Sequence, residues 1–157
     1  MADVALQSEW SLVEDQAFQL SQAAIRIDQI LQVEADNAYA NYLLGLVAGK
    51  KGNKDQAIDI IAKDVEADPE FAEAPNGLGT ILHEQGHLDE ALASYRQALA
   101  IYLDYPEAHN NLGLAFCDQG LLDEAAASCR EALARRPDYA EAHSNYGLVL
   151  SKQGRLE

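Results

Sequence analysis

The stretch from His83 to His87 is the strongest candidate for chemistry in the sequence, because it reads His-Glu-Gln-Gly-His. Zinc proteases use two histidines at this spacing on one face of a continuous helix, with the glutamate beside a metal-bound water. Gly86 within this stretch argues against a continuous helix. It belongs to a column of glycines that recurs at a constant interval, namely Gly52, Gly86, Gly120 and Gly154. We therefore expect a turn at Gly86, histidines on opposite sides of a helix break, and no zinc site.

The cysteines and the other histidines are explained by packing. Cys117 and Cys129 match neither a disulfide framework nor a pair of zinc ligands, and no basic residue stands close to Cys117 to activate it. We interpret both cysteines as small apolar residues of a core. His109 and His143 are separated by the same interval as the turn glycines, at a place where we expect side chains that lie between helices.

Two glycine-rich stretches could suggest nucleotide binding. Gly77-Leu78-Gly79 lacks the preceding strand that a dinucleotide site needs, and the stretch from Gly45 to Lys51 has neither the spacing of a phosphate loop nor a hydroxyl after its lysines. We therefore expect no cofactor, no metal and no catalytic residue. The sequence predicts a protein that is not an enzyme.

The composition restricts the class of partner. The chain has 157 residues, of which 48% are apolar, and its formal net charge is −15 at pH 7. A folded body with an acidic surface follows, and neither nucleic acid nor an anionic membrane is expected as partner, because both require a basic surface. The sequence begins without a basic leader or an apolar signal segment, and no run reaches membrane-spanning length. The expected location is the cytoplasm.

Small residues that recur every 34 positions define the organisation of the chain. A second glycine column consists of Gly45, Gly79, Gly113 and Gly147. Each period contains two stretches of helical apolar spacing separated by a turn glycine, so the sequence predicts pairs of antiparallel helices. We expect a single all-α repeat domain over residues 1–157. Its units are a degenerate helix pair at 4–37, full units at 38–71, 72–105 and 106–139, and a half unit at 140–157.

These columns resemble the tetratricopeptide repeat family over residues 38–157. The unit from residue 72 carries the small and large positions of the family as Leu78, Gly79, Leu82, Ala91, Tyr95 and Ala98. The resemblance implies a right-handed superhelical solenoid of antiparallel helix pairs. Departures from the family pattern are Asp64 in place of alanine, Cys129 in place of an aromatic residue, Leu103 in place of proline, and Ser11 and Phe18 in place of glycines.

The resemblance also implies a function, because in this family the first helix of each pair lines a concave groove for a peptide or protein segment. Tyr39 and Tyr42 would bury an apolar anchor, and Asn111 and Asn145 would bond to a peptide backbone, unless they bond only locally. The run from Ala108 to Gly113 is similar to the repeat domains of O-linked N-acetylglucosamine transferases, which suggests a bacterial region of that kind. The predicted groove residues are Tyr39, Tyr42, Leu46, Lys50, Asn76, Thr80, His83, Asn110, Asn111, Leu114, Asn145 and Leu148.

Two alternative functions stay open beside the peptide-binding module. The chain could be the substrate-selecting N-terminal region of a larger enzyme such as a glycosyltransferase. It could also be a self-assembling scaffold, because the apolar final helix would leave an exposed solenoid end through which copies form a homo-oligomer. The glutamates at 73, 107 and 141 are expected to form a solvated edge rather than a clamp for a basic ligand.

Overall fold

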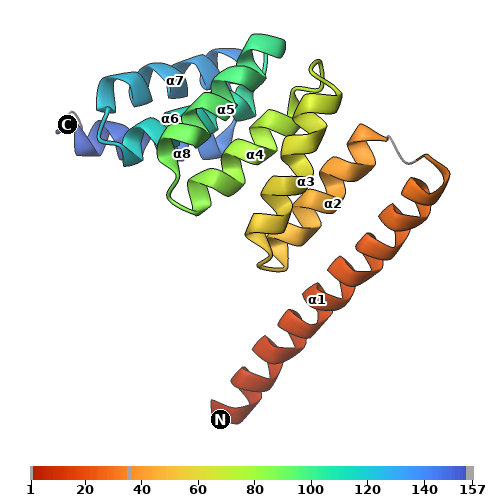
Figure 1. The fold of residues 1–157 in the computed structure, drawn as a ribbon. Helices are drawn as coiled ribbons and strands as arrows, with labels where there is room; N and C mark the ends of the chain where they lie inside the picture. Colours follow the sequence, from red (N-terminus) through yellow and green to blue (C-terminus); the bar gives the residue numbers. More distant parts are fainter. Residues whose placement is uncertain (1, 35–36, 155–157) are drawn as a thin grey trace. The chain divides into compact units, whose positions relative to one another are not determined.

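The computed structural model describes residues 2–34 and 37–154, with the side chains of the first helix from Gln16 onward. This part of the chain is helical and contains no strand (Figure 1), which confirms the all-α fold class. The helices are α1 (Ala2–Val33), α2 (Ala38–Lys50), α3 (Lys54–Ala67), α4 (Glu73–Glu84), α5 (Leu88–Ile101), α6 (Pro106–Asp118), α7 (Leu122–Arg135) and α8 (Ala140–Lys152). None of these helices combines the length and the apolar character that crossing a membrane requires.

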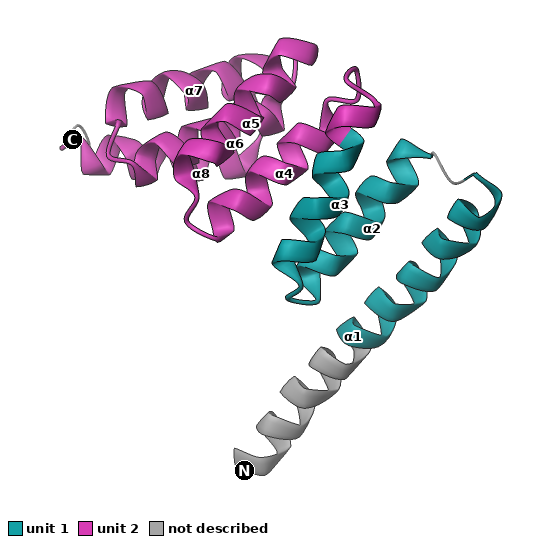
Figure 2. Cartoon of the chain, viewed as in Figure 1, with its two compact units in different colours: residues 1–64 teal, residues 65–157 magenta. Residues whose placement is uncertain are grey.

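The chain divides into two compact units (Figure 2). Unit 1 is Met1–Asp64 and unit 2 is Val65–Glu157, so the division falls within α3. Unit 1 contains α1, α2 and most of α3, and unit 2 contains α4 to α8. The single repeat domain predicted over residues 1–157 stays a prediction.

In unit 1, α1 packs against α2 through one apolar stripe. The buried residues of this contact are Ile27, Ala40 and Val47, and the apolar residues packed around them are Leu20, Ala23, Ala24, Leu31, Leu43 and Leu44. Leu20, Ala24, Ile27 and Leu31 of α1 follow one another at spacings of three and four residues, and Ala23 lies beside them, which places these residues on one face of the helix. The opposite face of α1 leaves Phe18 65% and Ile25 50% exposed.

The structure differs from the helix pair predicted for residues 4–37, because α1 is a single helix. Phe18 stands one repeat period before Gly52, at the place of the turn glycine. The turn glycines of the later units have positive φ values, between +69° and +89°. Phenylalanine rarely adopts this conformation, so the residue that should reverse the chain continues the helix instead.

In unit 2, α4 pairs with α5, α6 pairs with α7, and α8 packs on both α6 and α7. The small residues permit this close approach. A Cβ atom at Gly79 would lie 2.7 Å from the Tyr95 ring, and one at Gly113 would lie 2.9 Å from Cys129 Sγ. Alanines also recur every 34 positions in α5 and α7, the second helices of the two pairs. Four of these alanines have no exposed surface: Ala91, Ala98, Ala125 and Ala132. In this unit, the helices therefore pack closely at Gly79 and Gly113 because neither residue has a side chain.

The turn glycines lead to a first stability prediction. Gly86 has a φ of +82°, and a Cβ atom there would meet no atom within 4 Å, so an added side chain changes only the backbone energy. We expect Gly86→Ala to lower the free energy of unfolding by about 1–2 kcal/mol, as measured by urea denaturation. Gly86→Asn should cost less, because asparagine tolerates positive φ better than alanine. Equal losses for the two variants would contradict the backbone explanation.

Candidate functional site

The histidines at 83 and 87 lie on opposite sides of a helix break, as predicted. The break is at Gly86, between the end of α4 and the start of α5. His83 Nε2 lies 2.8 Å from Asp118 Oδ2, and His87 Nδ1 lies 3.3 Å from Glu90 Oε1. The two imidazoles therefore pair with different carboxylates. Among the described residues, no group of three or more His, Cys, Asp and Glu side chains could hold a metal ion.

Cys117 on α6 and Cys129 on α7 are both buried, as expected for small core residues. Burial raises the pKa of Cys129 to about 11, and the neighbouring Cys117 adds to the rise. A thiol with so high a pKa is almost entirely protonated near neutral pH and is a poor nucleophile. The Cys129 thiol therefore has a packing role.

The first helices α4, α6 and α8 lie next to one another in unit 2, since α6 contacts both α4 and α8. Most of the predicted groove residues are on these helices, and we call them the first-helix face: Asn76, Thr80, His83, Asn110, Asn111, Leu114, Asn145 and Leu148. The remaining predicted residues lie on α2 in unit 1, and they are Tyr39, Tyr42, Leu46 and Lys50.

Asn111, Asn76 and Tyr105 form a hydrogen-bond relay between α6 and α4. Asn111 Nδ2 donates to Asn76 Oδ1 at 3.1 Å, and Asn76 Nδ2 donates to the Tyr105 hydroxyl at 3.3 Å. Asn76 is only 8% exposed, which corrects its predicted place in the lining of a groove. Losing either bond would leave a buried polar group without water to replace it. The relay therefore fixes the orientation of the Asn111 carboxamide.

Asn145, Asn110 and Glu141 form a second relay between α8 and α6. Asn145 Nδ2 donates to Asn110 Oδ1 at 2.9 Å, and Asn110 Nδ2 donates to Glu141 Oε1 at 3.2 Å. Asn110 has no exposed surface, which corrects its predicted place in the lining of a groove. Its side chain is turned into the contact between the two helices, where both halves of the amide have partners.

Asn111 and Asn145 are the half-buried ends of the two relays and hold the same place in successive repeats. Among the residues that the structure describes, neither Oδ1 atom accepts a hydrogen bond. Each amide therefore uses a donor inside the protein and keeps an acceptor that a ligand N–H could use. The predicted contact of these two asparagines with a peptide backbone stays a prediction.

Of the other residues on the first-helix face, Thr80 forms hydrogen bonds within the protein, and Leu114 and Leu148 provide apolar surface. Thr80 Oγ1 donates to the Asn76 carbonyl at 3.1 Å, and the Tyr95 hydroxyl lies 3.5 Å from Thr80 Oγ1. Burial raises the pKa of Tyr95 to about 12, so this phenol stays neutral. Leu114 is half-buried and Leu148 is 44% exposed. The face therefore offers apolar patches beside its oriented amides.

The predicted residues of α2 give unit 1 an aromatic surface of its own. Tyr39 is 59% exposed, and its ring centroid lies 6.4 Å from that of Tyr42. Tyr42 and Leu46 are half-buried, and Lys50 is exposed in the last turn of the helix. A tilted aromatic pair with this exposure can cover an apolar side chain of a ligand, which is the use predicted for it.

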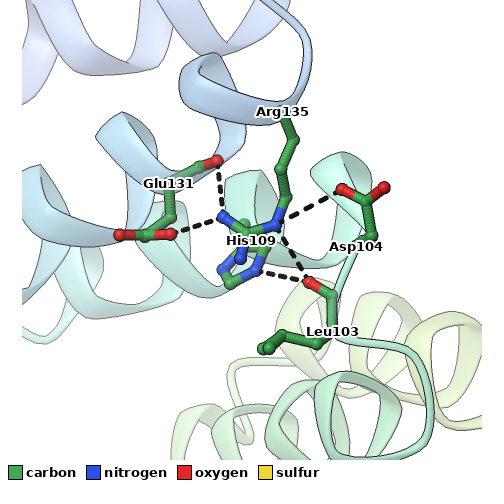
Figure 3. Close-up of polar contacts among 5 residues, drawn as sticks. All are labelled: Leu103, Asp104, His109, Glu131 and Arg135. Atoms are coloured by element: carbon green, nitrogen blue, oxygen red, sulfur yellow. Dashed lines mark hydrogen bonds and ion pairs between the residues drawn. The ribbon is translucent and has the colours of Figure 1, made fainter.

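A polar cluster fixes the loop between α5 and α6 to α7 (Figure 3). His109 Nε2 and Arg135 Nε each lie 3.0 Å from the Leu103 carbonyl oxygen. Arg135 also forms ion pairs with Glu131 and, at 3.6 Å, with Asp104. Burial lowers the pKa of His109, which favours a neutral ring that donates through Nε2. Two donors thus hold the loop carbonyl at the residue where the family pattern places proline.

The same histidine contact recurs one repeat later. His143 Nε2 lies 2.8 Å from the Pro137 carbonyl oxygen, six residues before it, as in the pair formed by His109 and Leu103. His109 is only 7% exposed and bonds to the loop that precedes its own helix. The burial of His109 agrees with the predicted place between helices, whereas His143 is exposed, so the prediction is wrong for His143 even though it forms the same bond.

Tyr105 is the residue of the site that the sequence interpretation missed. It ends the first relay by accepting a hydrogen bond from Asn76. Phe71, Tyr105 and Tyr139 stand at successive repeat intervals, and this aromatic column was the available signal. Tyr139 also contacts a relay, because its hydroxyl donates to Glu141 Oε2 at 3.4 Å.

Comparison with protein families gives two matches. A family model described as TPR repeat matches residues 79–120 and 113–154, and one described as tetratricopeptide repeat matches residues 38–71. The range 38–71 coincides with one predicted unit, whereas the other two ranges begin seven residues after the predicted units that start at residues 72 and 106. No curated protein sequence matches the chain.

Several solved structures share the fold at low sequence identity. The crystal structure of MamA is 22% identical with a TM-score of 0.76, over 90% of this chain and 83% of MamA. The first TPR of Spaghetti (RPAP3), bound to the HSP90 peptide SRMEEVD, is 23% identical with a TM-score of 0.72, over 74% and 93% of the two chains. YrrB, described as a TPR protein with an unusual peptide-binding site, is 24% identical with a TM-score of 0.68, over 95% and 77%. All three likenesses concern the fold.

Proposed function

Because the chain belongs to the tetratricopeptide repeat family, we propose that it is a protein-interaction module whose first-helix face binds an extended peptide segment. Stacked helix pairs offer a surface built from side chains of successive first helices. The structures of RPAP3 and YrrB, which share the fold, are described with a bound peptide or a peptide-binding site. They support the same class of ligand here.

The observation that carries the proposal is the pair of hydrogen-bond relays. Asn111 and Asn145 are oriented before any ligand arrives, because each donates to a buried asparagine. Ordering a free polar side chain on binding costs about 0.5–1.5 kcal/mol, and the relays reduce this cost. An extended chain presents N–H groups that carboxamide oxygens accept. The ligand would thus be held through its backbone and would gain affinity from apolar contacts.

The charge of the face favours a neutral or basic segment. Glu73, Glu84 and Asp118 are exposed on α4 and α6, within a chain of formal net charge −15. Complementary charge speeds association and disfavours partners of like charge. An acidic peptide such as the one in the RPAP3 complex would meet repulsion at this face.

The resemblance to O-linked N-acetylglucosamine transferase repeats supports a limited version of their asparagine ladder. Asn111 and Asn145 hold equivalent places, while Gly77 and Leu43 occupy the same column in the earlier units. The proposed backbone contacts are therefore confined to α6 and α8. The other residues of the first-helix face would contact the ligand through side chains that are not repeated from one unit to the next.

The proposal is tested by the double variant Asn111→Ala with Asn145→Ala. Labelled extended peptides of neutral and basic composition are screened on the 157-residue chain, and the affinities of the best binders are measured by fluorescence anisotropy. Loss of two oriented hydrogen bonds should weaken binding at least about tenfold, which corresponds to about 1.4 kcal/mol. Chemical shift changes in the unsubstituted protein should map to α4, α6 and α8.

Asn53→Ala provides the matched control, because Asn53 is exposed in the turn between α2 and α3 of unit 1. It should leave peptide affinity unchanged. Circular dichroism ensures that the double variant is compared at a temperature where it is folded. Undiminished affinity of the folded double variant, or shifts outside the three helices, would refute the proposed face.

A further inference from the structure

A cavity of about 500 Å³ lies in unit 1 between α1 and the end of α2. Its lining residues are Gln16, Ala17, Leu20, Ser21, Lys50 and Lys51. Ala17 lies three residues before Leu20, so it continues the stripe through which α1 packs on α2. The cavity thus combines an apolar wall on α1 with polar and charged groups around it.

Lys50 and Lys51 give this cavity its positive charge. Both side chains are exposed, and neither ammonium group bonds to any residue that the structure describes. Cations at the C-terminal end of a helix interact favourably with its dipole, which gives the two lysines a structural reason to be there. The dipole does not account for the apolar cavity beside them, whose volume is sufficient for one or two ligand side chains.

We propose that this cavity binds an acidic peptide segment, with a carboxylate on Lys50 and Lys51 and an apolar side chain on Ala17 and Leu20. Hydrogen bonds between ammonium and carboxylate groups are strong because both partners are charged. Ser21 Oγ donates to the Ala17 carbonyl at 2.9 Å, so the hydroxyl oxygen keeps lone pairs for a peptide N–H.

The charge of the whole chain restricts the ligand to a few carboxylates. A formal net charge of −15 repels a polyanion such as nucleic acid at longer range, whereas a short segment with one or two carboxylates gains from the local lysine pair. This ligand differs from the neutral or basic segment proposed for the first-helix face. The two sites also lie in different units, so an experiment can refute the proposal for one site while the proposal for the other site holds.

The test uses the 157-residue chain and two capped octapeptides. One alternates leucine with aspartate, and the other carries asparagine in place of aspartate. In an NMR titration, the aspartate peptide should shift the amide signals of residues 16–21 and 50–51, and the asparagine peptide should not. The double variant Lys50→Gln with Lys51→Gln should bind the aspartate peptide at least about tenfold more weakly.

A charge-matched control is the double variant Arg26→Gln with Lys63→Gln. Both residues are exposed in unit 1 and do not line the cavity, so binding should stay within about threefold because distant exposed charges are screened. All substituted side chains are exposed, and circular dichroism verifies the fold. Absence of shifts, equal binding of both peptides, or equal losses in the two double variants would overturn the proposal. So would self-association that only Lys50→Gln with Lys51→Gln abolishes, because the occupant would then be a second copy.

Discussion

Gly79→Ala should lower the free energy of unfolding by about 1–3 kcal/mol, the usual cost of overfilling a packed contact. The new Cβ atom would lie 2.7 and 2.8 Å from two atoms of the Tyr95 ring. Tyr95 is 1% exposed, so the ring has no free space into which it can move. Urea denaturation followed by far-UV circular dichroism measures the loss.

Gly147→Ala is the matched control, because Gly147 holds the same place in α8 and a Cβ atom there would meet nothing within 4 Å. Alanine is a better helix former than glycine by about 0.8–1 kcal/mol, so this variant should be neutral or slightly more stable. The same substitution thus has opposite expected signs at two equivalent positions. Equal losses at both would show that the column glycines serve backbone conformation rather than close packing.

Asp64→Ala should raise the free energy of unfolding by about 1–3 kcal/mol near neutral pH, the usual cost of a buried polar group without a partner. Asp64 is 3% exposed, and its buried Oδ2 atom has no hydrogen-bond partner among the described residues. Ala98 and Ala132 hold the same column in the next units and have no exposed surface. Alanine therefore suits the space better than a carboxylate.

The gain from Asp64→Ala should depend on pH. Burial raises the pKa of Asp64 from 3.8 to about 6, so the native state binds the proton more tightly than the unfolded state. The penalty of the carboxylate is then absent below about pH 4, grows as the pH rises, and is complete above about pH 6. The difference in unfolding free energy between the variant and the original chain should accordingly shrink from about pH 7.5 to about pH 4.5.

Asp59→Ala removes an exposed carboxylate from the same helix and should change stability by no more than about 0.5 kcal/mol. If Asp64→Ala gave a gain that did not change with pH, the stabilisation would come from helix propensity alone. A loss of stability at every pH would mean that the carboxylate has a favourable interaction.

The repeat structure could be predicted because two local requirements recur in the sequence. Gly86 shows one of them, since a turn with positive φ needs glycine. Gly79 shows the other, since only a residue without a side chain leaves space for the ring of Tyr95. Both needs are visible in residue type alone. Phe18 shows the limit, because a family register can be extended to a position whose residue cannot make the turn.

The site was less predictable, because groove residues were assigned by position in the repeat. Adjacent residues of a helix point about 100° apart, so Asn110 and Asn111 have different surroundings although both were assigned to the groove. The structure buries Asn110 and leaves Asn111 half-buried. Tyr105 was missed for a different reason. Its bond to Asn76 joins residues 29 positions apart, and no spacing rule within one helix indicates it.

The imidazole bonds at the loops affect which sequences the loops can tolerate. A proline restricts a loop through its own ring, whereas His109 and His143 restrain the loop from outside by binding a main-chain oxygen. Main-chain oxygens are the same for every amino acid, so such a restraint does not depend on which residue supplies it. The same restraint therefore acts on a loop with leucine at 103 and on a loop with proline at 137, and in both cases it ties the loop to the helix that follows.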